Sequence, residues 1–178
     1  MAKMIVVNEQ RCLGCRQCTI ECAMAHTDAR TLAEALSLQQ PPQPRVHVEA
    51  VGASGMPLQC RHCEDAPCLA ICPTGAISRP AEGGPVLLDA ERCIGCKFCL
   101  LVCPFGVIEL SRDGKAAIKC DQCFERTEAG EAPACVAGCP TGALEFRDVT
   151  EWLAERRRQA VAAVARARLA AAAEEAKT

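Results

Sequence analysis

Sixteen of the 178 residues in this chain are cysteines, and their spacing limits the folds that the chain can adopt. The first and third of four groups have the spacing C-x2-C-x2-C-x3-C, which is typical of chains that bind [4Fe–4S] clusters. With four thiolates per cluster, the cysteines predict four [4Fe–4S] clusters with none left over, and therefore a chain that carries electrons. The groups are Cys12, Cys15, Cys18 and Cys22; Cys60, Cys63, Cys68 and Cys72; Cys93, Cys96, Cys99 and Cys103; and Cys120, Cys123, Cys135 and Cys139.

Zinc is the main alternative, because zinc sites built from four cysteines would consume the same residues. Zinc sites are usually built from two separated C-x2-C pairs, and they do not require a third cysteine followed by a C-x3-C step. The sequence therefore favours iron over zinc, and the brown colour of iron–sulfur proteins would distinguish the two.

Large side chains are scarce, since aromatic residues make up only 3% of the chain and tyrosine is absent. We expect clusters to fill part of the interior, so the metal-free chain should be poorly folded. The formal charge is −2, and each oxidised cluster with its thiolates adds about −2 more. This acidic balance argues against nucleic-acid binding as the main role.

The N-terminal segment gives no sign of export or membrane insertion. Residues 1–8 hold a short apolar run without a twin arginine or a cleavage site. No apolar stretch approaches the ~18 residues of a membrane-spanning helix. We therefore expect a cytoplasmic protein without a membrane span, although a folded subunit can also be exported with a partner that carries the signal.

The segments between the cysteine groups predict short strands and loops, and hence an α+β fold. A Pro-Thr-Gly or Pro-Phe-Gly sequence follows the last cysteine of the second, third and fourth groups, and indicates a turn that leads into a strand. Leu32–Leu38 predicts one or two helical turns, and Glu125–Ala134 is a polar insertion. The expected strands are Met4–Asn8, Arg45–Val51, Pro85–Asp89, Ala116–Lys119 and Leu144–Asp148.

The order of the groups predicts two nested bacterial-ferredoxin-like units. In two-cluster ferredoxins each group lends its last cysteine to the other group's cluster. Because only twenty residues separate Cys72 from Cys93, groups two and three should pair, with groups one and four pairing around them. We expect an outer unit over residues 1–30 and 112–148, a connector over 31–56, an inner unit over 57–111 and a C-terminal helix over 149–178.

The C-terminal segment differs from the rest, because it is rich in alanine and arginine. From Glu151 to about Lys177 it predicts one long helix of roughly 39 Å. Docking on a partner or on another copy of the chain is the favoured role, ahead of a frayed tail or a helix on a membrane surface. The apolar stripe is weak and consists of Leu153, Ala160, Val161, Val164 and Ala171.

The three histidines are candidate ligands or tuning residues. His62 lies between Cys60 and Cys63, where a donated hydrogen bond would raise the reduction potential of a cluster. A structural role is favoured for His62, and more strongly for His26 and His47.

Other residues beside the cysteines suggest no catalysis. Lys97, Lys119 and Arg16 could offset cluster charge, but solvated side chains are the favoured interpretation, while Phe98 and Phe105 are expected to pack against clusters. The sequence holds neither a glycine-rich dinucleotide motif nor a P-loop. We therefore expect a non-catalytic chain, with any flavin or nicotinamide site on another subunit.

The cysteine motifs resemble those of the four-cluster ferredoxin-like electron-transfer subunits of molybdenum and tungsten oxidoreductases. The family includes small subunits of formate dehydrogenase, hydrogenase and carbon monoxide dehydrogenase complexes. The resemblance covers about residues 4–147. It is carried by Arg11–Cys18, Gln59–Cys63, Ala66–Cys68, Arg92–Cys99 and Lys119–Cys123.

The resemblance implies a ligand set for each cluster. Cys99 stands where some relatives have tryptophan and a three-iron cluster, so all four clusters should contain four irons. The implied sets are Cys12, Cys15, Cys18 and Cys139; Cys120, Cys123, Cys135 and Cys22; Cys60, Cys63, Cys68 and Cys103; and Cys93, Cys96, Cys99 and Cys72.

The implied function is that of a wire subunit, which relays single electrons between a catalytic subunit and a flavin- or ferredoxin-type partner. The catalytic subunit would be an aldehyde or formate oxidoreductase with molybdenum or tungsten, or a hydrogenase. The C-terminal helix could join copies into an oligomer or filament. A free-standing polyferredoxin is the alternative.

Overall fold

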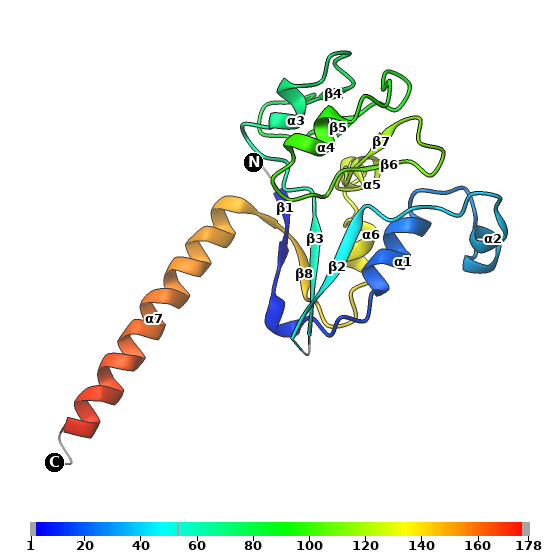
Figure 1. Cartoon of the computed structure of the whole chain (residues 1–178). Helices are drawn as coiled ribbons and strands as arrows, with labels where there is room; N and C mark the ends of the chain where they lie inside the picture. Colours follow the sequence, from blue (N-terminus) through cyan, green and yellow to red (C-terminus); the bar gives the residue numbers. More distant parts are fainter. Residues whose placement is uncertain (1–2, 53, 176–178) are drawn as a thin grey trace.

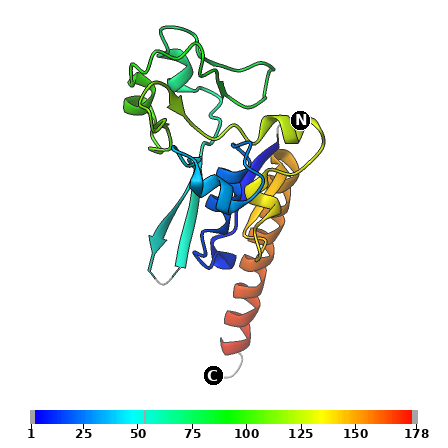
Figure 2. The same ribbon diagram turned by 90° about the vertical axis from the view of Figure 1, so that its right-hand side faces the viewer.

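The computed structural model describes residues 3–52 and 54–175, which form an α+β fold (Figure 1). Four two-stranded antiparallel sheets and several short helices make up a body that carries all the cysteines, and one long helix projects from this body (Figures 1 and 2). The helices are α1 (Gln17–Met24), α2 (Leu32–Ser37), α3 (Pro67–Ala70), α4 (Phe98–Val102), α5 (Phe124–Glu128), α6 (Ala134–Ala137) and α7 (Val149–Glu175), with a 3-10 turn at Glu9–Arg11.

The sheets bring together segments that are far apart in the sequence as well as neighbouring ones. β1 (Lys3–Val7) pairs with β8 (Leu144–Asp148), so the two ends of the cysteine-bearing region lie side by side (Figure 1). This pairing is what an outer unit closed by groups one and four would need. The other pairs are local: β2 (Val46–Val51) with β3 (Ser54–Gln59), β4 (Ile77–Ser78) with β5 (Leu87–Leu88), and β6 (Glu109–Leu110) with β7 (Ala117–Ile118).

Most of the expected strands are confirmed, although several are shorter than predicted. β8 has the predicted bounds, and α2 ends one residue before the predicted Leu38. Residues 54–59 are absent from the expected strands, yet β3 pairs there with β2 over its whole length. Gly55 and Pro57 gave this segment the composition of a loop, and only its pairing with β2 makes it a strand.

The buried residues form two clusters, and both are rich in cysteine. One contains Cys18, Cys22, Cys120 and Cys135, and the other contains Cys68 and Cys99 with Cys63, Cys72, Cys93 and Cys103 packed against them. The remaining buried apolar side chains are aliphatic, and no aromatic residue is among those described as buried. The largest fully buried side chains are Gln59, Val46, Val86, Val107, Pro57 and Pro133.

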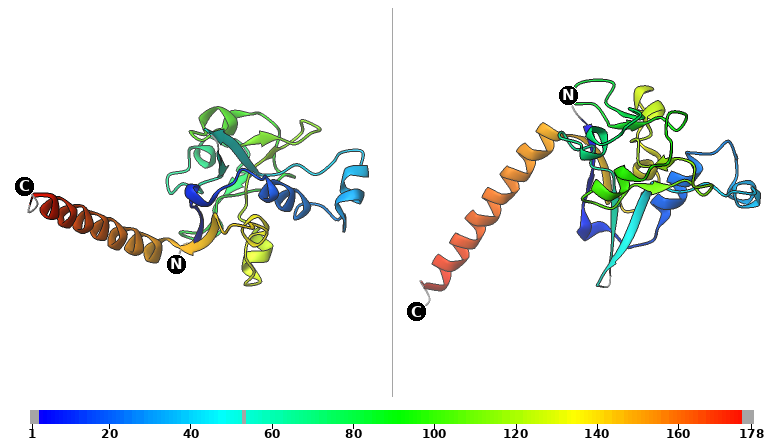
Figure 3. Two further views of the ribbon diagram at one scale, coloured as in Figure 1. Left: turned by 90° about the horizontal axis from the view of Figure 1, so that it is seen from below. Right: turned by 45° about the horizontal axis from the view of Figure 1, so that its top comes forward.

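Helix α7 begins against the body and then extends away from it, on the side opposite α2 (Figures 1 and 3). The Asp148 carboxylate caps it by accepting hydrogen bonds from the backbone N–H groups of Thr150 (2.9 Å) and Glu151 (3.1 Å). Arg147 on β8 donates to Glu155 at 2.7 Å. The predicted end near Lys177 lies outside the described residues. Within the described part of the chain, no helix has the length and hydropathy needed to cross a membrane.

Candidate iron–sulfur sites

The first cysteines of each group lie on loops. Residues in the left-handed backbone conformation give these loops their shape. Arg16 (φ 61°) and Lys97 (φ 68°) occupy equivalent positions in groups one and three, each just before a helix. Gly14 (φ 67°) and Gly95 (φ 65°) precede the second cysteine of the same groups. A Cβ atom on Gly95 would lie 2.7 Å from the carbonyl oxygen of Lys115, so the loop requires glycine there.

The third cysteine of each group lies on a short helix. These cysteines are all buried, whereas the first two of groups one to three are at least partly exposed. In each group, the first three cysteines therefore lie on a loop and the start of a helix, and the fourth cysteine lies further along the sequence. The helical positions are Cys18 on α1, Cys68 on α3, Cys99 on α4 and Cys135 on α6.

Two cavities in the upper part of the body are each lined by four cysteines. Cys60, Cys63 and Cys68 line the first together with Cys103, which is the last cysteine of the third group. Phe105 also lines this cavity. The third group therefore completes the quartet of the second.

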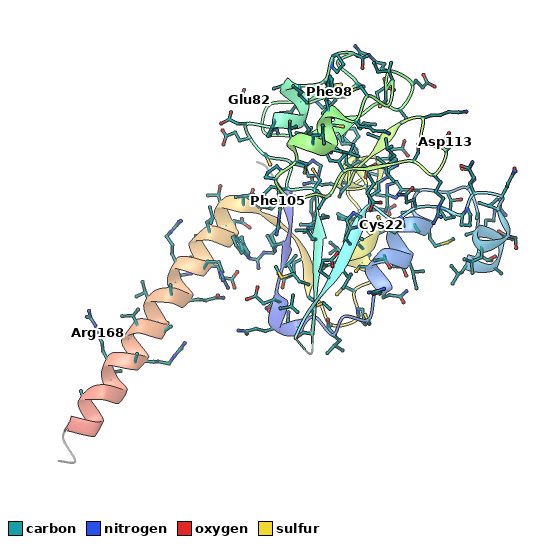
Figure 4. All side chains as sticks on the ribbon, viewed as in Figure 1. Cys22, Glu82, Phe98, Phe105, Asp113 and Arg168 are labelled. Carbon is teal, nitrogen blue, oxygen red and sulfur yellow. The ribbon has the colours of Figure 1, made fainter. Side chains whose placement is uncertain are left out.

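The second cavity has the reciprocal composition. Cys93, Cys96 and Cys99 line it with Cys72, the last cysteine of the second group. Phe98 contributes to its wall. The two phenylalanines thus lie beside different cysteine quartets, although both remain partly exposed, and Figure 4 labels them on this part of the body.

The cysteines of groups one and four are also interleaved. Burial, followed by the nearby thiolates of Cys139, Cys15 and Cys12, raises the pKa of the Cys18 thiol to about 11. The last cysteine of group four therefore lies with the first three of group one.

The other quartet is formed around Cys135. Burial raises the pKa of its thiol, and the thiolates of Cys120, Cys22, Cys123 and Cys18 raise it further. Cys22, labelled in Figure 4 next to β2, is the last cysteine of group one. Two of the predicted ligand sets thus line cavities of the structure, while cysteines of the other two lie near one another in a shared buried cluster.

Four thiols converging in buried surroundings are a fitting donor set for a [4Fe–4S] cluster. Crowding of thiolates at low dielectric is unfavourable unless metal ions offset their charge, because like charges raise one another's pKa. Such a cluster would accept and release single electrons. The chain's own contribution is to hold the thiols, limit the access of water and set the surrounding charge.

Sequence comparisons agree with this donor set. The chain matches the 4Fe-4S dicluster domain over residues 52–149 and a 4Fe-4S binding domain over residues 9–25. The chain belongs to the 4Fe-4S dicluster family. The match confirms the predicted family and shows that its cofactors are [4Fe–4S] clusters, in place of the alternative of zinc.

Three curated relatives match most of the chain. An iron-sulfur protein of Rhodospirillum rubrum is 40% identical over 158 residues, which cover 82% of each chain. The putative electron transport protein YsaA of Escherichia coli is 43% identical, covering 89% of this chain and 98% of the relative. The thiosulfate reductase electron transfer subunit PhsB of Salmonella typhi is 37% identical, covering 84% and 80%. These names confirm the prediction of an electron-transfer chain without a catalytic role.

Backbone N–H groups and threonine hydroxyls lie within hydrogen-bonding distance of several cysteine sulfur atoms. The backbone N–H of Arg45 donates to Cys22 Sγ at 3.2 Å. Burial raises the pKa of the Cys72 and Cys139 thiols, but backbone N–H groups and a threonine hydroxyl two residues on outweigh it, so both pKa values are lowered. Those hydroxyls are Thr74 Oγ1, 3.7 Å from Cys72 Sγ, and Thr141 Oγ1, 3.8 Å from Cys139 Sγ.

His26 has a structural role. Its Nδ1 lies 2.6 Å from the carbonyl oxygen of Cys22, and its Nε2 lies 3.2 Å from the Asp121 carboxylate, which also pairs with Arg45. Both partners accept hydrogen bonds, so both ring nitrogens carry protons. Burial lowers the pKa of His26, but its hydrogen bonds to Asp121 and to Cys22 together outweigh burial and raise the pKa to about 9. With both nitrogens occupied, His26 is not a metal ligand in this arrangement.

His47 and His62 have different surroundings. His47 Nδ1 lies 3.8 Å from a carboxylate oxygen of Glu109. His62 Nδ1 accepts a hydrogen bond of 3.0 Å from the backbone N–H of Val86. This places the proton of neutral His62 on Nε2, which is buried and has no partner among the described residues. Burial, and then the charge of Lys119, lower the pKa of His62 to about 3.

The charged residues beside the cysteines divide into two kinds. Arg16 and Lys97 are exposed, as expected for solvated side chains. The same interpretation of Lys119 is wrong, because only 3% of that residue is exposed. A lysine beside a cysteine carries no local signal of burial, so sequence reasoning could not distinguish Lys119 from Lys97.

Proposed function

We propose that this chain relays single electrons through four [4Fe–4S] clusters, between a catalytic redox subunit and an electron-accepting or electron-donating partner. The observation that supports the proposal is the exchange of cysteines between groups two and three, in which the last cysteine of each group lines a cavity with the first three of the other. Interleaved ligands place clusters of one unit close to each other, as electron transfer requires.

The ligand sets are part of the same proposal. The inner unit, residues 57–111, would hold two clusters, and the outer unit, residues 1–30 and 112–148, the other two. The proposed sets are Cys12, Cys15, Cys18 and Cys139; Cys22, Cys120, Cys123 and Cys135; Cys60, Cys63, Cys68 and Cys103; and Cys72, Cys93, Cys96 and Cys99.

Iron counts in cysteine variants test these sets. The wild-type chain should bind about sixteen irons, at four per cluster. Cys60→Ser and Cys103→Ser should each disturb one cluster, and the double variant should lose no more iron than either single variant. Cys93→Ser combined with Cys103→Ser should lose the iron of two clusters. The reverse result would mean that each group holds its own cluster.

The partner is proposed from the relatives. PhsB is named as an electron transfer subunit of thiosulfate reductase, which supports a catalytic partner subunit here. A molybdenum or tungsten enzyme or a hydrogenase fits this role, with or without a flavoprotein. Anoxic affinity purification from the native host tests it: co-purification of a large redox subunit supports a wire subunit, whereas a lone chain with full iron favours a free polyferredoxin.

Helix α7 supports a second part of the proposal, namely assembly with a partner or with another copy. Val161, Val164 and Leu169 are 70%, 55% and 72% exposed, on a helix that leaves the body. Removing residues 160–178 keeps Trp152 and the contact of Glu155 with Arg147. We expect this truncated chain to retain its iron and to form a smaller complex by native mass measurement. An unchanged complex would contradict an assembly role.

A further inference from the structure

The Lys119 ammonium is buried between backbone carbonyl groups. Its Nζ donates hydrogen bonds to the carbonyl oxygens of Val86 and of Cys120, the latter at 2.8 Å. None of the ion pairs found among the described residues includes Lys119. A buried charge without a counter-charge is strongly unfavourable. Negative charge at the neighbouring cysteine quartets would therefore stabilise this ammonium.

Two cysteine quartets lie near this ammonium. Val86, whose carbonyl oxygen accepts one of its hydrogen bonds, lines a cavity with four cysteines, and the other acceptor is the backbone of Cys120. Cys68 lines the cavity of the inner unit that Cys103 completes. Cys120 belongs to the outer quartet with Cys22 and Cys135. Lys119 is thus close enough to influence one site in each unit.

The Val86 peptide holds the ammonium in this place. The N–H of Val86 donates to His62 Nδ1, while its carbonyl oxygen accepts from Lys119. Val86 is 1% exposed. If the lysine side chain turned toward solvent, two buried carbonyl groups would lose their donor, which is costly. The charge is therefore fixed between the two sites.

A fixed positive charge changes the redox balance of neighbouring anionic sites. A [4Fe–4S] cluster with four thiolates is an anion, and reduction adds one negative charge to it. A nearby cation stabilises the reduced form more than the oxidised form, because attraction grows with charge. Reduction potentials of such clusters respond to the charge and hydrogen bonds around them.

We propose that Lys119 is a positioning charge shared by two cluster sites, one in the inner and one in the outer unit, which raises the reduction potentials of both. The sites are those of Cys60, Cys63, Cys68 and Cys103, and of Cys22, Cys120, Cys123 and Cys135. One electron passes from one site to the other, and Lys119 keeps its protons throughout. This inference rests on the proposed four-cluster function.

The test is a redox titration of the holoprotein, followed by electron paramagnetic resonance. In Lys119→Met, two of the four reduction potentials should each fall by about 59 mV. This shift corresponds to a tenfold change in a one-electron equilibrium constant. The other two should stay unchanged. Lys115→Met is the matched control, because it removes a lysine four residues earlier whose side chain is 84% exposed, and it should leave all four potentials unchanged.

Two further variants test the role of the Lys119 charge if Lys119→Met loses iron. Lys119→Gln keeps a hydrogen-bond donor without the charge, and should lower the same two potentials. Lys119→Arg keeps the charge and should restore them. Four unchanged potentials in an iron-replete Lys119→Gln variant would overturn the inference, as would a fall in Lys119→Arg equal to that in Lys119→Gln. Failure of the wild-type chain to bind four clusters would instead refute the proposed function.

Discussion

A Cβ atom on Gly55 would lie 2.6 Å from the Cα atom of Gly14, so the backbones of two distant segments are in direct contact. Gly14 lies in the first cysteine loop, between Cys12 and Cys15, and Gly55 lies on β3. A side chain at position 55 would also meet Val48 at 3.0 Å. The β2–β3 hairpin therefore supports the first cysteine loop through a contact that only glycine permits.

Replacing Gly55 with alanine should displace the first cysteine loop, because the backbone of Gly14 cannot yield as a flexible side chain would. We expect Gly55→Ala to lose about four of about sixteen irons, with the other clusters retained. Iron and sulfide analysis measures this. Ser54→Ala, at an exposed position of the same hairpin, should bind iron like the wild type. Full iron content in Gly55→Ala would show that the loop adapts.

The threonine hydroxyls near Cys72 and Cys139 should raise the potentials of their sites. Thr141→Val removes the hydroxyl that lies 3.8 Å from Cys139 Sγ while keeping the side-chain shape. Loss of a hydrogen bond worth about 1 kcal/mol should lower one potential by about 40 mV. Redox titration measures the shift, and Thr141→Ser should behave as the wild type. Equal potentials in the valine and serine variants would exclude this role.

His62 should influence the site of Cys60, Cys63, Cys68 and Cys103 through its buried Nε2–H. We expect His62→Leu to lower one reduction potential, and to destabilise the protein by about 1–3 kcal/mol because the Val86 N–H loses its acceptor. Redox titration and thermal bleaching separate the two effects. His47→Leu is the control. A loss of stability with all four potentials unchanged would leave His62 with a structural role only.

The Asp121 carboxylate should stabilise the outer quartet that contains Cys22, because it holds both His26 and Arg45. We expect Asp121→Asn to cost about 2 kcal/mol, and thus to lower the midpoint of anoxic thermal bleaching by roughly 4–8 °C. Asp28→Asn, at a position away from this network, should have no effect.

The same network has a predictable pH dependence. The folded-state pKa of His26 is raised to about 9 from 6.5, so its stabilising contribution is complete below 6.5 and is lost as the pH rises through about 9. The difference between Asp121→Asn and the wild type should therefore shrink in alkali. A difference that grows above this pH would contradict the assignment of a protonated His26.

Removing the clusters should unfold most of the body. Its buried apolar residues are aliphatic side chains and cysteines without a buried aromatic residue among those described, and such a core buries limited apolar surface without clusters. After chelation and oxidation we expect the loss of dispersed proton resonances and of a cooperative thermal transition. Alanine-rich α7 should keep part of the helical circular dichroism. A cooperative transition in the iron-free chain would disprove this dependence on clusters.

Local patterns predicted the elements that depend on neighbours in the sequence. The bounds of β8 and the position of α2 followed from strand and helix propensities. The β3 strand was missed, because Gly55 and Pro57 disfavour a strand until β2 lies beside them. Gly55 also carried no visible signal of its contact with Gly14, since a close approach between distant segments has no local pattern.

The sequence alone determined the kind of cofactor of this protein, since the spacing of cysteines within a loop is that of [4Fe–4S] clusters. It also indicated that neighbouring groups share ligands. Only the tertiary structure decided which polar groups lie between the sites. Lys119 and Lys97 both lie beside cysteines, but one is buried and the other is exposed. Burial arises from packing between segments far apart in the chain, and the charge that acts on each cluster depends on that packing.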